Sequence, residues 1–157
     1  MSVKTILIEP NKLLRQVSRK VEKVGDEERA LMDDMLDTMY DAPGIGLAAI
    51  QIGIPKRIIV MDISKAENKE PRYFVNPVIK NKNKEKTKYE EGCLSVPDQF
   101  AEIERPNTCE VEYLDYDGKK RLLKADGLLA TCIQHEMDHL EGILFIDYLS
   151  KLKKSMI

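Results

Sequence analysis

The chain has 157 residues, of which 43% are hydrophobic and 33% are charged, a composition typical of a single globular domain. Its 25 basic and 27 acidic residues give a net charge of −2, so electrostatics do not indicate nucleic acid as a partner. No apolar run approaches the roughly 18 residues of a membrane span, and residues 1–10 lack the features of a signal or transit peptide. We therefore expect one cytoplasmic domain over residues 1–157, with its three cysteines reduced.

Two helices are predicted near the N-terminus. Asn11 can cap a short helix that begins near Lys12. Asp26 can cap a longer helix over residues 27–40, in which apolar residues recur at helical spacing. The Ala-Pro-Gly cluster at residues 42–44 should end this second helix.

The middle of the chain is rich in strand patterns. Pro77 restricts part of one predicted strand to a sheet edge or a bulge. The lysine-rich residues 80–88 predict a solvated hairpin or loop, and Asp117-Gly118 predicts a tight turn between two strands. The predicted strands are residues 57–63, 73–79, 99–104, 108–116 and 120–125.

A last helix is predicted over residues 127–140, with Asp126 as its N-cap and Gly142 at its C-terminal stop. The elements thus run from helices through strands to one final helix. This order predicts an α+β domain in which antiparallel sheets pack around the last helix.

The most informative motif lies on that helix: His135-Glu136-Met137-Asp138-His139, which contains both histidines of the chain. Two imidazoles four residues apart project from one helix face, about one turn from each other. That spacing suits a divalent metal, with Glu136 as a candidate general base. The alternative is that both histidines are half-buried core residues bonded to their neighbours.

A catalytic metal site usually needs a third protein ligand, and the chain has no third histidine. Glu141 lies too close in the helix to return to the same ion. Cys93, in a segment containing Gly92 and Pro97, is the better candidate because a thiolate binds borderline metals strongly. Cys132 is a rival, although one helix rarely supplies all three ligands.

Another distinctive segment is Gly44-Ile45-Gly46-Leu47-Ala48-Ala49-Ile50-Gln51. Its glycines allow another chain to approach closely, and Gln51 offers a neutral amide donor. It lacks the three spaced glycines of a dinucleotide-binding fingerprint. The alternative interpretation is a simple turn between a helix and a strand.

Together, three segments resemble the motifs of the peptide deformylase family, in order and at the family's usual separations. They are residues 44–51, Glu91-Gly92-Cys93-Leu94-Ser95, and Gln134-His135-Glu136-Met137-Asp138-His139. The resemblance covers nearly the whole chain, from Ile8 to Leu149. It implies the deformylase α+β fold, with antiparallel sheets around a central metal-binding helix.

The same resemblance implies an amide hydrolase that acts in N-terminal processing during protein biosynthesis. The enzyme would remove the N-formyl group from the initiator methionine of nascent polypeptides and release formate. Cys93, His135 and His139 would hold one Fe²⁺, for which Zn²⁺, Ni²⁺ or Co²⁺ can substitute. A hydroxide on the metal would attack the formyl carbon, with Glu136 as general base and acid.

The family's motifs also imply roles for the surrounding residues. Gln51 and the Leu94 N–H would stabilise the oxyanion, and Glu91 would support the metal site. An extended peptide would lie along backbone near Gly44, Ile45, Gly46 and Gly92. The walls of the methionine pocket are expected to be Ile45, Tyr89, Leu128, Thr131 and Cys132.

The chain departs from the family pattern in two places. Tyr89 stands where a smaller aliphatic residue is common in the family, so we expect a different pocket shape. Lys151 to Ile157 is shorter than the C-terminal helix of many relatives, which weakens the expectation of ribosome association. We expect a monomer, with no membrane or direct nucleic-acid contact.

Two other functions remain open from the sequence. One is a zinc peptidase of the His-Glu-x-x-His type, which would not need Cys93. The other is a catalytically silent relative that binds formylated peptides. The presence of both Glu136 and Gln51 argues against the silent relative.

Overall fold

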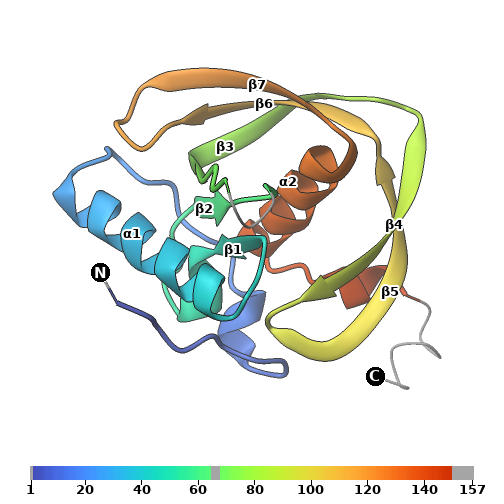
Figure 1. Ribbon diagram of the computed structural model, residues 1–157, viewed down its shortest axis with the longest axis horizontal. Coiled ribbons are helices and arrows are strands. Elements are labelled where there is room, and N and C mark those ends of the chain that lie inside the picture. The colour runs from blue at the N-terminus through green and yellow to red at the C-terminus, as the bar shows by residue number, and fades with distance from the viewer. Residues whose placement is uncertain (1, 65–67, 150–157) are drawn as a thin grey trace.

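The computed structural model describes residues 2–64 and 68–149 and contains two α-helices, three 3₁₀ helices and seven strands in that part of the chain (Figure 1). The α-helices are α1 (Asp26–Asp41) and α2 (Gly127–Leu140), and the 3₁₀ helices are η1 (Lys12–Arg15), η2 (Ala49–Ile52) and η3 (Phe145–Tyr148). The strands are β1 (Gly46–Ala48), β2 (Ile58–Met61), β3 (Arg72–Lys82), β4 (Lys86–Cys93), β5 (Val96–Pro106), β6 (Thr108–Leu114) and β7 (Lys120–Asp126).

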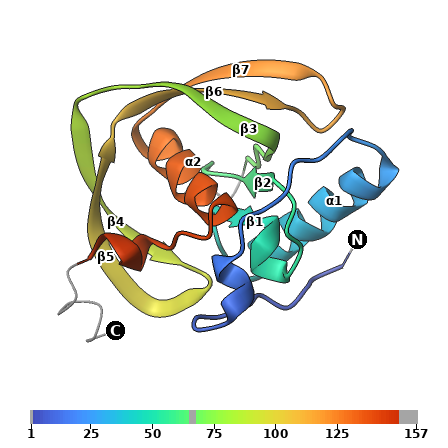
Figure 2. The same ribbon diagram turned by 180° about the vertical axis from the view of Figure 1, so that it is seen from behind.

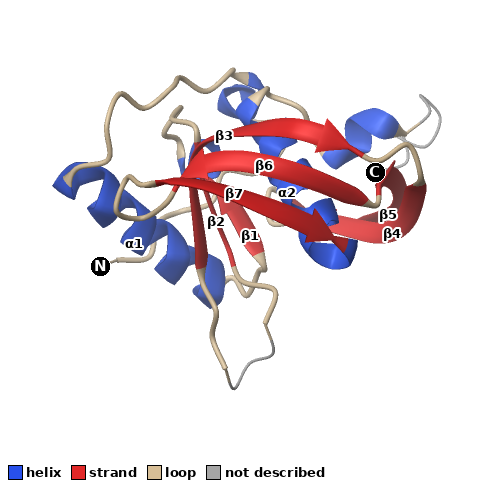
Figure 3. Cartoon of the chain, turned by 90° about the horizontal axis from the view of Figure 1, so that it is seen from above, coloured by secondary structure: helices blue, strands red, loops and turns tan. Residues whose placement is uncertain are grey.

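The strands form two antiparallel sheets, and α2 lies between them (Figures 1 and 2). The larger sheet has the order β1-β2-β3-β6-β7, and the smaller sheet pairs β4 with β5. Figure 3 shows β3, β6 and β7 running side by side across α2. The predicted α+β fold with antiparallel sheets around the last helix is confirmed.

Strand β2 is buried on both faces of the larger sheet, which explains its unbroken apolar run. Ile59 and Met61 pack on the α2 side, together with Ala130 and Ile133 of that helix. Ile58 and Val60 point to the opposite face and pack against methionines of α1: Met32, Met35 and Met39. Because side chains alternate along a strand, one short apolar segment joins the two helices to the same sheet.

The smaller sheet has its own apolar cluster, which it shares with the C-terminal 3₁₀ helix η3. Val96 and Ile103 of β5 pack there with Leu144, Phe145 and Ile146. Cys93, at the end of β4, borders the same cluster. The cluster therefore places Cys93, a residue of the smaller sheet, beside α2.

The helices are close to prediction, with one wrong cap. Asn11 caps η1 through its side chain, and α2 spans the predicted residues, although the side chain of Asp126 makes no capping bond. Gly25, not Asp26, is the N-cap of α1, and its N–H donates to the Glu28 carboxylate. Asp26 instead lies in the first turn, where its negative charge interacts favourably with the positive end of the helix dipole.

Several strand predictions need correction. Residues 80–88 form no hairpin: β3 extends to Lys82, and β4 begins at Lys86 in the other sheet. The lysines there are compatible with strands because alternate side chains reach solvent. Pro77 lies at a bulge of the interior strand β3, so the bulge alternative is confirmed. Gly46–Ala48 forms a strand that was not predicted.

The turn between β6 and β7 follows the prediction, with Gly118 at a φ of +83°. No helix in the described ranges combines the length and apolar character that crossing a bilayer requires. The prediction of one domain over residues 1–157 stays a prediction, and the C-terminal segment Lys151 to Ile157 lies outside the described residues.

Candidate metal centre and active-site cleft

The helix α2 carries His135, Glu136 and His139 on the side that faces β1 and the smaller sheet. All three side chains are buried, and His139 is fully inaccessible. The two imidazole rings lie 5.1 Å apart between centroids, in an edge-on arrangement. The four-residue spacing therefore places both rings on one helix face, as predicted.

Cys93 completes a three-residue cluster with these histidines. The candidate ligand atoms of Cys93, His135 and His139 all lie within 4.8 Å of one another, and Cys93 Sγ is 3.3 Å from His139 Nε2. One thiol and two imidazoles are a donor set that suits borderline divalent cations. The residues thus fit a metal. Cys132, the rival ligand, does not join the cluster.

Glu136 lies beside this cluster without belonging to it. Its Oε1 is 4.0 Å from His139 Nε2 and has no hydrogen-bond partner among the described residues. Burial raises the pKa of Glu136 to about 7. A buried carboxyl group with an open acceptor and such a pKa can take up and release a proton near neutral pH.

Gln51 points its amide nitrogen at the same cluster. Its Oε1 accepts from the Ala48 N–H at 2.9 Å, which fixes the orientation of the carboxamide. Its Nε2 consequently faces Ser95 Oγ at 3.0 Å and Cys93 Sγ at 3.6 Å. A neutral donor is therefore held next to the candidate metal ligands.

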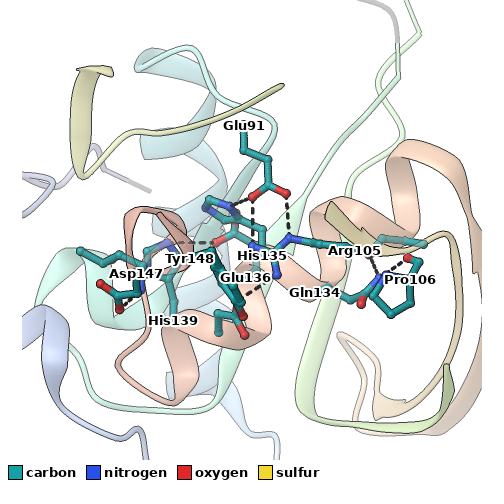
Figure 4. A network of polar contacts seen from close by, with 12 residues as sticks. Glu91, Arg105, Pro106, Gln134, His135, Glu136, His139, Asp147 and Tyr148 are labelled. Carbon is teal, nitrogen blue, oxygen red and sulfur yellow. Dashed lines mark hydrogen bonds and ion pairs between the residues drawn. The ribbon is translucent and has the colours of Figure 1, made fainter. Parts of the chain in front are cut away.

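A buried chain of charged contacts supports His135 from behind (Figure 4). Nδ1 of His135 lies 2.9 Å from Oε1 of Glu91, which leaves Nε2 as the nitrogen that can ligate a cation. Glu91 also accepts two hydrogen bonds from Arg105, at 2.7 and 3.0 Å. Glu91 thus contacts a candidate ligand directly, and its supporting role stays a prediction. Arg105 was not predicted, because it lies in a different segment without a motif of its own.

The electrostatics of the two histidines differ. At His135, burial opposes the charged form, but hydrogen bonds with Cys93 and Glu91 outweigh it and raise the pKa to about 10. At His139, burial lowers the pKa well below its ordinary value. Metal ligation requires neutral imidazoles, so cation binding would displace the proton from His135.

The predicted site residues converge on one cleft with a volume of about 640 Å³. All of them line it except His139, which lies behind the surface next to Cys93. The predicted residues in its wall are Gly44, Ile45, Gly46, Gln51, Tyr89, Glu91, Gly92, Cys93, Leu94, Leu128, Thr131, Cys132, His135 and Glu136. Phe100, 67% exposed at the rim, was not predicted.

Glycines keep this cleft open at three places. A Cβ on Gly46 would lie 2.6 Å from Oε2 of Glu136. A Cβ on Gly44 would meet the Leu94 side chain at 2.7 Å, and one on Gly92 would meet the Phe100 ring at 2.6 Å. Each distance is below ordinary van der Waals contact, so the close approach of these segments depends on the missing side chains.

Sequence comparisons match the chain to one protein family. A family model described as polypeptide deformylase matches residues 3–155. The peptide deformylase of Pelagibacter ubique is 87% identical to the chain, over 100% of the chain and 92% of the relative. The peptide deformylase of Rhizobium meliloti is 57% identical, over 100% of the chain and 91% of the relative.

Solved structures show the same fold. The crystal structure of peptide deformylase from Ehrlichia chaffeensis has a TM-score of 0.95 and 45% identity, covering 99% of this chain and 92% of that one. The structure of that enzyme in complex with actinonin also has a TM-score of 0.95, with 46% identity and coverage of 99% and 94%. The chain therefore belongs to the polypeptide deformylase family.

Proposed function

We propose that this protein is an amide hydrolase that removes the N-formyl group from the initiator methionine of nascent polypeptides. Water adds to the formyl carbon, the C–N bond breaks, and the products are formate and a free amino terminus. The observation that carries the proposal is the buried cluster of Cys93, His135 and His139 beside Glu136, in a chain of the deformylase family.

Cys93, His135 and His139 would hold one divalent metal. When bound, such a cation supplies Lewis-acid chemistry, because it lowers the pKa of a water and polarises a carbonyl oxygen. We propose Fe²⁺ as the native ion because the resemblance to the deformylase family implies it, and one soft thiolate with two imidazoles is compatible with that ion. The same donor set accepts Zn²⁺, Ni²⁺ or Co²⁺.

Glu136 would act as the general base and then as the general acid. Its Oε1 lacks a hydrogen-bond partner among the described residues and lies near Nε2 of His139, so it can accept a proton from the attacking water. It would then pass a proton to the departing amine. The raised pKa of about 7 suits both directions of transfer.

The oxyanion that forms at the formyl carbon would be stabilised by Gln51 and by the backbone N–H of Leu94. The contact between Ala48 N–H and Gln51 Oε1 supports this role, because it fixes the side-chain amide with its NH₂ toward Cys93. A donor that is already oriented costs no reorganisation when charge develops. Loss of one such donor typically lowers the rate by about 10²–10³-fold.

The peptide would lie in the cleft as an added extended strand, along Gly44, Ile45, Gly46 and Gly92. The methionine side chain would enter a pocket with walls from Ile45, Tyr89, Leu128, Thr131 and Cys132. All of these residues line the cleft. The hydroxyl groups of Tyr89 and Thr131 would make this pocket more polar than a purely aliphatic one.

The site of action would be the bacterial cytoplasm, where formylated chains are made. The relatives from Pelagibacter ubique and Rhizobium meliloti support a bacterial setting. That the protein works as a monomer stays a prediction.

The proposal is tested by loading purified protein with Fe²⁺ without oxygen and measuring formate release from formyl-Met-Ala-Ser. We expect formate in a one-to-one ratio with new amino termini. Acetyl-Met-Ala-Ser serves as the control, since the bulkier acyl group should be cleaved far more slowly. Full metal occupancy without formate release would reject the hydrolase and favour a binding protein.

A further inference from the structure

The metal centre is supported from one side by the 3₁₀ helix η3, which follows α2. Phe145 of η3 is buried and stacks on the His135 ring, with centroids 6.1 Å apart and planes inclined by 27°. Leu144 and Ile146 belong to the apolar cluster that Cys93 borders. Residues of η3 therefore pack beside two of the three candidate ligands.

Tyr148, the last residue of η3, is connected to one of these ligands, His135, by a chain of polar contacts. Its hydroxyl donates to Oδ2 of Asp138 at 2.7 Å, and Nη1 of Arg105 donates to that same oxygen at 2.8 Å. The Arg105 guanidinium also lies over the Tyr148 ring, 5.0 Å from its centroid. Tyr148 thus contacts Arg105 directly and also through Asp138.

From Arg105 the contacts continue to the metal ligand. Nε and Nη2 of Arg105 bind both oxygens of Glu91, and Oε1 of Glu91 lies 2.9 Å from Nδ1 of His135. A two-point contact between guanidinium and carboxylate fixes the plane and direction of both groups. The position of Arg105 therefore determines where Glu91 can hold the His135 ring.

We propose that Tyr148 is a positioning residue of the metal centre: by holding Asp138 and Arg105, it fixes Glu91 and thereby the orientation of His135. Glu91 binds two donors of Arg105, and Asp138 binds a third. Tyr148 acts at this third contact, because its hydroxyl holds the same oxygen of Asp138 and its ring lies against the guanidinium. Burial and the bond to Asp138 raise the pKa of Tyr148 to about 12, so the hydroxyl stays protonated even well above neutral pH.

This inference rests on the metal site of the proposed function, and its test begins with the wild-type protein. Wild-type protein that binds no Co²⁺ would reject the proposed site itself, before any variant is compared. With Co²⁺ bound, the absorption bands of the ion report the geometry of the thiolate and imidazole ligands. The rate of Co²⁺ loss to excess chelator reports how firmly they hold it.

The informative variant is Tyr148→Phe, which removes the hydroxyl and keeps the ring beneath Arg105. Its matched control is Tyr116→Phe, because Tyr116 also donates to a carboxylate, that of Asp33, but lies outside the metal site. Loss of a group that orients a ligand typically costs 10- to 100-fold in metal affinity or activity, and we expect about 3- to 10-fold faster Co²⁺ release from this more remote residue. Tyr148→Leu, which removes the ring as well, should release Co²⁺ faster still.

Two further readouts separate positioning from a general loss of stability. In Tyr148→Phe the Co²⁺ bands should shift and kcat should fall with KM unchanged, whereas the melting temperature of the metal-free protein should match that of Tyr116→Phe. The inference is overturned if Tyr148→Phe and Tyr116→Phe share the same Co²⁺ bands and release rate. It is equally overturned if faster release is accompanied by a matching drop in the melting temperature of the metal-free protein.

Discussion

At the scale of single residues, Glu136 is the side chain whose surroundings differ most from those of an ordinary carboxylate. It is buried, its Oε1 has no hydrogen-bond partner among the described residues, and burial raises its pKa to about 7. An uncompensated buried carboxylate is unfavourable for folding. A buried carboxylate that is unfavourable for folding and lies beside candidate metal ligands is typical of a catalytic group.

Glu136→Gln should retain the metal and lose turnover. The amide has the same shape but cannot accept a proton, and removal of a general base typically costs about 10²–10⁴-fold in rate. Metal content would be measured by elemental analysis and turnover by formate release. Glu22→Gln, at an exposed position outside the cleft, is the matched control and should behave like the wild-type protein. Loss of metal from Glu136→Gln would instead assign the residue to the metal site.

At the scale of secondary-structure elements, the first residue of the short strand β1 determines how closely this strand approaches α2. Gly46 begins this strand and pairs with Met61 of β2. A Cβ there would lie 2.6 Å from Oε2 of Glu136 and 3.0 Å from Sγ of Cys132. The approach thus depends on glycine at this position.

Gly46→Ala should reduce activity much more than stability. The new methyl group would meet the carboxylate at the far end of the Glu136 side chain and displace it, and a displacement of about 1 Å can cost on the order of 10²-fold in rate. Gly25→Ala is the control, because its Cβ would meet nothing closer than 3.4 Å and its φ is −120°. The measurements are kcat/KM and the melting temperature. Normal kcat/KM in Gly46→Ala would contradict the role assigned to β1.

Asp62 directly follows the neighbouring strand β2 and binds Ser64 and Glu70 further along the chain. Its Oδ1 accepts from the N–H and the hydroxyl of Ser64, and its Oδ2 accepts from the Tyr40 hydroxyl and the Glu70 N–H. Burial tends to raise the pKa of Asp62, but these donors outweigh it and lower the pKa overall. The folded state therefore favours the charged carboxylate.

Asp62→Asn should destabilise the protein at neutral pH, by about 1.5–3 kcal/mol for lost hydrogen bonds to a charged group. In the variant, the side-chain amide nitrogen would face the N–H and O–H donors whose hydrogen bonds the Asp62 carboxylate oxygen accepts. Because the folded pKa lies below the unfolded value of about 3.9, this stabilisation is complete above that value and is lost as pH falls through the folded pKa. The difference in melting temperature from the wild-type protein should accordingly shrink below about pH 4. Asp117→Asn, at an exposed position in the turn between β6 and β7, is the control for the substitution itself. A difference for Asp62→Asn that stays constant with pH would contradict the argument.

At the scale of the whole molecule, the candidate metal centre connects parts that the backbone keeps separate. Cys93 ends β4 in the smaller sheet, whereas His135 and His139 belong to α2, which packs on the larger sheet. A cation held by all three residues would tie the smaller sheet to the helix. It should therefore stabilise the folded state as a ligand does.

Chelation of the metal should lower the melting temperature. At a free metal concentration about 1,000-fold above Kd, the bound ion contributes about 4 kcal/mol. Cys93→Ala should abolish most of this dependence, because only two imidazoles of one helix remain. Cys109→Ala, at a buried position in the core outside the ligand cluster, should keep the full response. A Cys93→Ala protein that is stabilised by metal like the wild type would exclude Cys93 as a ligand.

The sequence by itself determined the features that depend on local spacing. The four-residue separation of His135 and His139, the boundaries of α2 and the Asp117-Gly118 turn all follow from the geometry of a few consecutive residues. The resemblance of three short motifs then indicated the fold and the family, and the comparisons confirmed both. These inferences required no knowledge of which strands pair.

Only the tertiary structure decided which distant side chains meet at the metal centre. Glu91 and Arg105 come together because β4 pairs with β5 in a particular register, and Asp138 and Tyr148 join them because η3 folds back toward β5 and the end of α2. Strand register and the path of a connecting segment depend on the packing of the whole core, which no local pattern specifies. The sequence therefore predicted the candidate ligands, whereas the side chains that hold them in place emerged only from the fold.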